Sequence, residues 1–141
     1  MFNPSRDESR RFLIDAWAKH RAGQPLSGLE AIVARIVALH PEYHPVLEAP
    51  EKFAHRDYRP ETGEVNPFLH LTLHLALAEQ LAIDQPPGIK AHFERLREAR
   101  GDEHAALHAV LECLGEVIWA SQRHGTPPDA KLYLDCLERQ R

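Results

Sequence analysis

Three histidine pairs, each with a spacing of four residues, are the residues of this chain whose types and positions point to chemistry. The pairs are His40 with His44, His70 with His74, and His104 with His108. On an α-helix, residues four apart lie on one face about one turn from each other, so both rings of a pair can hold the same ion. Neutral imidazole is a good ligand for zinc, copper, iron and nickel. The spacing therefore predicts metal binding.

A carboxylate accompanies the third pair, because Glu112 lies one turn beyond His108. This arrangement is similar in ligand chemistry to hemerythrin-type di-iron sites, in which Glu112 would bridge the ions. Ferritin-like sites use Glu-x-x-His, a motif that the chain lacks. A mononuclear three-histidine site with an open position, as in the metal-dependent DinB-type bundles, needs only half of the histidines. Both kinds of site remain open at this point.

The elements that must position these rings are helices. The stretch that begins at Asn66 has an N-cap residue and then Pro67, a strong helix start, and its apolar stripe includes His70 and His74. Ser27 and Glu30 form the capping-box pattern of another helix. Further starts are predicted near Ser5, Asp84, Glu103 and Thr126, and no strand is predicted.

The predicted fold is therefore all-α: one domain over residues 1–141, a bundle of about six helices with an up-and-down, four-helix-like core. Residues 45–65 are predicted as a long aperiodic loop. In an up-and-down bundle, the end of the second helix and the starts of the third and fifth meet at one end. All six imidazoles, with Glu112 nearby, would then share one partly buried layer.

Composition excludes several classes of protein. The net charge of −4 over 141 residues disfavours a protein that binds nucleic acid through its phosphates. No apolar run approaches the length of a membrane span, and no hydrophobic signal region follows Met1, so the cytoplasm is the expected compartment. Cys113 and Cys136 are too few and too far apart for a disulfide framework or a zinc knuckle and are expected to be buried thiols. A homodimer is left open.

Several segments resemble a known family. They are Met1–Arg6, the His40-Pro41-Glu42-Tyr43-His44 segment, Asn66–Leu71, Ile83–Ile89, Asp102–His104 and Glu112–Glu116. Together they are similar to an uncharacterised bacterial family, domain of unknown function 1841, over essentially the whole chain. The resemblance implies no activity, substrate or catalytic residue.

Three functions are consistent with the pattern. The first is a metal-binding helical protein, with iron preferred over zinc, in a redox, O2-handling or sensing role. The second is a zinc-type hydrolase or transferase in which Glu112 or Glu116 is the general base and the segment with Asp57, Tyr58 and Glu61 is a lid. The third is a non-enzymatic interaction module with structural histidines.

Overall fold

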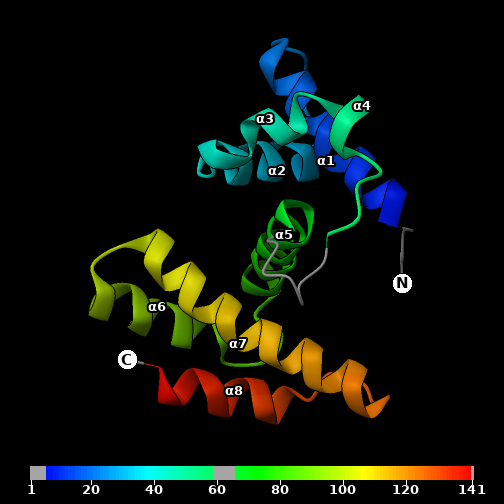
Figure 1. Ribbon diagram of the computed structural model, residues 1–141. Coiled ribbons are helices and arrows are strands. Elements are labelled where there is room, and N and C mark those ends of the chain that lie inside the picture. The colour runs from blue at the N-terminus through cyan, green and yellow to red at the C-terminus, as the bar shows by residue number, and fades with distance from the viewer. Residues whose placement is uncertain (1–5, 59–65, 141) are drawn as a thin grey trace. The chain divides into compact units, whose positions relative to one another are not determined.

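The computed structural model describes residues 6–58 and 66–140, and within these ranges all of the regular secondary structure is helical, without a strand (Figure 1). The all-α class predicted from the sequence is thereby confirmed. The chain divides into two compact units, Met1–Leu75 and Ala76–Arg141. Each unit is described by itself, and a single domain with an up-and-down core stays a prediction.

The described ranges contain eight α-helices where about six were predicted; four of them start within two residues of the predicted positions, whereas α6 and α8 start four to five residues later. The first unit contains α1 (Arg6–Arg21), α2 (Gly28–Ala38), the 3-10 turn η1 (Pro41–Tyr43), α3 (His44–Leu47), α4 (Pro50–Phe53) and the first half of α5 (Pro67–Ile83). The second unit contains the rest of α5, then α6 (Ile89–Arg100), α7 (Glu103–His124) and α8 (Ala130–Arg139). The structure differs from the predicted loop in its first part, because η1, α3 and α4 lie within residues 41–53 as consecutive short helical turns. Residues 59–65 of the predicted loop lie outside the described ranges.

Side chains at the helix starts account for these bounds. The Ser27 hydroxyl accepts from the Glu30 N–H, and the Glu30 carboxylate accepts from the Ser27 N–H, which completes the predicted capping box of α2. The Asn66 side-chain oxygen accepts from the N–H of Leu69, three residues on, at the start of α5. The Asp102 carboxylate does the same for α7. Local sequence therefore determines where the histidine-bearing helices begin.

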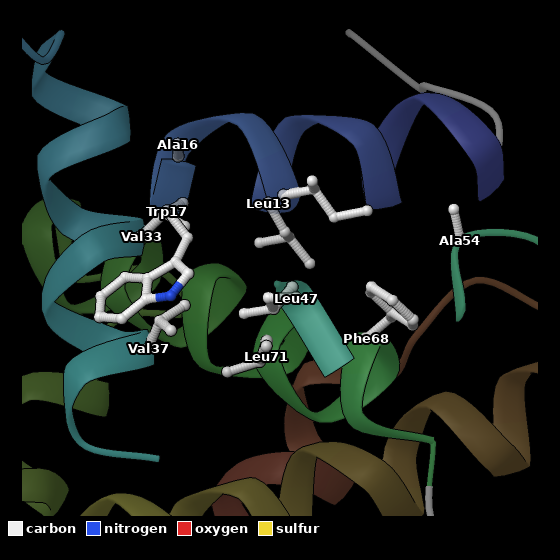
Figure 2. Packing of buried hydrophobic residues seen from close by; sticks show 10 residues of the cluster. Leu13, Ala16, Trp17, Val33, Val37, Leu47, Ala54, Phe68 and Leu71 are labelled. Carbon is white, nitrogen blue, oxygen red and sulfur yellow. The ribbon is translucent and has the colours of Figure 1, made fainter. Parts of the chain in front are cut away.

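The core of the first unit lies where α1 packs against α2 and the short helices (Figure 2). Its buried apolar residues are Leu13, Ile14, Ala16, Trp17, Val33, Val37, Leu47, Ala54, Phe68 and Leu71. Arg10 is also buried, and its guanidinium donates to the carbonyls of Ala54 and Arg56 and lies 4.7 Å from the centre of the Phe68 ring. Burial lowers the pKa of Arg10. The arginine therefore fastens α1 to the segment that follows α4.

In the second unit, α7 packs against α6 and α8. The Tyr133 hydroxyl donates to the side-chain oxygen of Gln80 at 2.8 Å, and burial raises the pKa of Tyr133. Cys113 of α7 and Cys136 of α8 form a disulfide, so the expectation of two buried thiols is wrong. Their linear separation of 23 residues hid the pairing, because helices adjacent in the chain pack side by side and bring distant positions together.

None of the helices in the described ranges has the length and apolarity that crossing a bilayer requires.

Candidate metal centre

Three of the predicted histidines come together within the first unit. His40 lies between α2 and η1, while His70 and His74 lie one turn apart on α5. One ring nitrogen from each of these residues lies within 4.8 Å of the others. His40 and His74 are almost completely buried, with 1% and 3% of their surface exposed, and His70 is half-buried. We refer to His40, His70 and His74 as the histidine cluster; it can hold a metal ion.

The rings of the histidine cluster are inclined steeply to one another. The His40 ring makes angles of 74° with the His70 ring and 67° with the His74 ring, and His70 and His74 are inclined at 70°. Their centroids are 4.5–5.0 Å apart. The Nε2 atoms of His40 and His70 approach to 3.2 Å. The cluster therefore presents nitrogen atoms from three differently oriented rings to one small volume.

The end of α2 orients the His40 ring. Its Nδ1 lies 2.8 Å from the carbonyl oxygen of Ile36, and because a carbonyl only accepts hydrogen bonds, Nδ1 must carry the proton. In the neutral ring, the lone pair is then on Nε2, the atom that faces His70. A ligating histidine usually donates its second N–H to an oxygen in this way, which fixes both tautomer and orientation. The backbone of α2 thus prepares His40 as a ligand.

Tyr43 lies beside two rings of the cluster, and sequence reasoning missed it. Its ring stacks on His40 at 5.6 Å with only 6° between the planes, and it meets the His70 ring edge-on at 5.8 Å. Burial, with a smaller effect from the charge of Glu42, raises the pKa of Tyr43. The available signal was its position in η1, one residue before His44, but nothing in the residue pattern indicated which way its ring would lie.

His44 is not part of the histidine cluster. Its Nε2 lies 2.8 Å from the Val37 carbonyl, to which it donates, and its ring packs at 4.6 Å against that of Trp17. The reason is that α2 ends at Ala38 and η1 intervenes, so His40 and His44 do not belong to one continuous helix. A spacing of four residues places two side chains on one face only within a continuous helix, so it does not bring these two rings together. This member of the first predicted pair has a packing role.

The third pair lies in the second unit. His104 and His108 are both half-buried on α7, and their rings meet edge-on with centroids 4.1 Å apart. The spacing therefore places both rings on one face of the helix, as predicted. That this pair shares an ion with the other histidines stays a prediction.

Glu112 does not accompany His108 as a ligand would. Its side chain is exposed, and its Oε2 accepts from the Gln140 amide at 3.4 Å. The buried stripe of α7 includes Ala106, Val110, Cys113 and Val117, the face that packs in the second unit's core. Glu112 lies off that stripe, next to the end of α8. The structure gives no support to Glu112 as a bridging carboxylate.

The other residues that were assigned possible catalytic roles lie elsewhere. Glu116 is exposed and its Oε2 lies 3.4 Å from the Cys136 sulfur. Asp57 pairs with Arg6 on the surface, and Glu61 lies outside the described residues. Among the described residues, neither Glu116 nor Asp57 therefore has an evident catalytic geometry.

The fold and the site define a class: an all-helical protein with a buried histidine cluster that can hold a metal ion. The family model described as domain of unknown function (DUF1841) matches residues 5–139. The chain belongs to this family, as the resemblance indicated. No curated protein and no solved structure matches the chain.

Proposed function

We propose that the protein binds one transition-metal ion through His40, His70 and His74. The observation that carries the proposal is the convergence of three ring nitrogens within 4.8 Å of one another, from two separate segments of the first unit. Two of these rings are almost fully buried. Buried polar groups require partners, and an ion satisfies several imidazole lone pairs at once.

The separation of the nitrogen atoms suits one ion. Nitrogen ligands bound at about 2.0–2.1 Å lie about 2.9 Å apart at a right angle and about 3.4 Å apart at the tetrahedral angle. The 3.2 Å between the Nε2 atoms of His40 and His70 falls between these values. Without the ion, the same contact is a hydrogen bond that needs a proton on one of the two Nε2 atoms, and with a neutral His40 that donates from Nδ1 this proton is on His70. Binding an ion would exchange that proton for the metal.

A single ion is favoured over a bridged pair of ions. A hemerythrin-type di-iron site requires a bridging carboxylate, and Glu112 is exposed and bonded to Gln140. Three imidazoles around one ion leave coordination positions for an external ligand, which is typical of reactive centres and not of closed structural ones. We propose non-haem iron in a redox, O2-handling or sensing role as the first assignment, with zinc as the second.

The hydrolase or transferase alternative has less support. A metal-dependent hydrolase needs a general base within hydrogen-bond reach of the nucleophile. Of the two candidates, Glu112 is bonded to Gln140 and Glu116 lies against the Cys113–Cys136 disulfide. The interaction-module alternative has no specific observation in its favour.

Metal analysis of the untagged full chain tests the proposal. We expect about one ion per chain, with nitrogen ligands at about 2.0–2.1 Å by X-ray absorption. His70→Ala removes a half-buried ligand and should abolish stoichiometric binding. The matched control is His55→Ala, because the His55 side chain is 76% exposed in the same unit and outside the cluster. A visible absorption band distinguishes iron from colourless zinc.

The variant His108→Ala tests the sequence-based prediction that the third pair contributes a ligand. Loss of metal from His108→Ala would support that prediction, and full retention would limit the ligands to the histidine cluster. Metal that is absent from the parent protein, or retained by His70→Ala, would refute the proposed function. Circular dichroism of each variant verifies that the helices remain folded.

A further inference from the structure

The two sulfurs of the Cys113–Cys136 disulfide differ in their access to solvent. Cys113 on α7 is completely buried, with 0% of its surface exposed, whereas Cys136 on α8 keeps 6%. In thiol–disulfide exchange, an external thiolate attacks the sulfur that it can reach, and the other sulfur leaves. Access therefore favours attack at Cys136, with Cys113 as the leaving group.

A carboxylate lies beside the accessible sulfur. Oε2 of Glu116, on α7, is 3.4 Å from the Cys136 sulfur. Neither sulfur of a disulfide carries a proton, so this contact is not a hydrogen bond, and it places negative charge directly next to Cys136. The carboxylate therefore opposes the formation of a thiolate on Cys136, and it also repels negative charge on any thiol that approaches this sulfur.

A hydrogen-bond donor lies beside the buried sulfur. Arg100 donates to the Gln140 side-chain oxygen at 3.1 Å, which settles the orientation of that amide. Its Nε2 then contacts both Glu112 Oε2 at 3.4 Å and the Cys113 sulfur at 3.8 Å. An N–H group at this place stabilises the negative charge that develops on a leaving sulfur. The surroundings of the two sulfurs therefore agree with their access: when the bond opens, the charge goes to Cys113.

We propose that the Cys113–Cys136 bond is a thiol–disulfide exchange site that opens at Cys136 and that Glu116 makes selective against anionic thiols. In the first step, an external thiolate bonds to the Cys136 sulfur while the S–S bond breaks, and Cys113 leaves with the electron pair and takes a proton from water. In the second step, another thiolate attacks the reagent's sulfur in the mixed disulfide, and Cys136 leaves and is protonated. The protein gains two electrons, and two external thiols become one disulfide. The reductant that fits this site is a thiol in neutral or basic surroundings.

This exchange site lies in the second unit and does not depend on the metal proposed for the first. A metal-free protein would therefore leave the proposal intact, and a redox-inert disulfide would leave the proposed function intact.

The experiment measures how fast three thiols reduce the full-length oxidised protein. Cysteamine carries a positive charge beside its sulfur, mercaptoethanol carries none, and mercaptopropionate carries a negative charge. Glu116→Gln removes the charge next to Cys136 with little change in shape. The rate of the variant relative to the parent should rise at least about fivefold more for mercaptopropionate than for cysteamine, because a unit charge about 4 Å away in water has an effect of that order. Mercaptoethanol should lie between them. Comparing each thiol with itself removes differences in intrinsic reactivity.

A matched variant and a trapping measurement complete the design. Glu103→Gln makes the same charge change at an exposed position at the start of α7, and it should leave the relative rates of the three thiols as they are in the parent. Alkylation during the reaction traps the mixed disulfide, and mass spectrometry of the peptides then locates the reagent. We expect the reagent on Cys136 and the alkyl group on Cys113.

Each part of the proposal has its own contrary result. Equal acceleration of all three thiols by Glu116→Gln would show that the substitution only loosens the packing, which would overturn the charge selectivity. Reagent bound to Cys113 would overturn the direction of opening. A disulfide that none of the three thiols reduces in the folded protein would overturn the exchange site itself.

Discussion

Reduction of the Cys113–Cys136 disulfide should destabilise the second unit, and the length of the loop that the bond closes determines by how much. The bond closes a loop with a sequence separation of 23 residues. In the chain-entropy description, a loop of this length restricts the unfolded chain enough to stabilise the folded state by about 3.4 kcal/mol. Breaking the bond should therefore raise the unfolded fraction about 300-fold, since each 1.4 kcal/mol is a factor of about ten.

Hydrogen exchange followed by mass spectrometry measures this effect in each unit separately. Oxidised and dithiothreitol-reduced forms of one sequence are compared, so that no packing changes with a substitution. Amides of α7 and α8 should lose protection on reduction, while those of α1 and α2 serve as the internal control. The double variant Cys113→Ala/Cys136→Ala should show no further response to reductant.

Equal protection in the oxidised and reduced forms would refute the entropic argument. A thiol count on protein that is unfolded without reductant tests the bond itself. Two reactive thiols per chain would show that the disulfide is absent. The result also bears on the compartment, because stable disulfides are typical of oxidising environments. The cytoplasmic location predicted from the sequence stays a prediction. The redox state of Cys113 and Cys136 in cells would test it.

Two further predictions concern the first unit. The Lys19 ammonium, and then the Ser27 N–H, hold the pKa of Glu30 below its ordinary value of 4.5, so the stabilisation by Glu30 is present above that pH and is lost as the pH falls through the lowered pKa. Thermal melts of Glu30→Gln should therefore lie below the parent's near neutral pH and converge with them in acid, and a constant gap would contradict this cause. The second prediction concerns the Tyr43 ring, which stacks on His40. We expect Tyr43→Leu to weaken metal binding about tenfold by releasing the His40 ring, and Tyr43→Phe to bind metal as the parent does. Isothermal titration measures both affinities, and an unchanged affinity in Tyr43→Leu would show that the stacking only fills space.

The part of the site that was predictable from the sequence depends on continuous helix. His70 and His74 lie within α5, which starts where Asn66 and Pro67 predicted. Their four-residue spacing therefore corresponds to one face, and their rings do lie together. The same reasoning holds for His104 and His108 on α7. Periodicity is reliable wherever the local caps determine the helix that carries it.

The parts that were not predictable depend on tertiary contacts. Glu112 has the right spacing from His108, but α7 is buried by α6 and α8 along a stripe that excludes it. Cys113 lies on that stripe and meets Cys136 only because α8 packs there. Spacing along one helix says which residues share a face but not which neighbour covers that face.

His40 combines both kinds of information, and its position explains why the cluster forms at the end of a helix. Pro41 cannot continue the hydrogen bonding of α2, so the chain leaves the helix at His40 with φ −126° and ψ 65°. The Ile36 carbonyl near the end of α2, which also accepts the Leu39 N–H at 3.1 Å, accepts the His40 Nδ1–H. This second bond anchors the ring to the helix terminus and selects the tautomer whose Nε2 faces His70. Termination of the helix and preparation of the ligand are the same structural event, which is why a histidine before a proline could not be recognised as a ligand from helical periodicity alone.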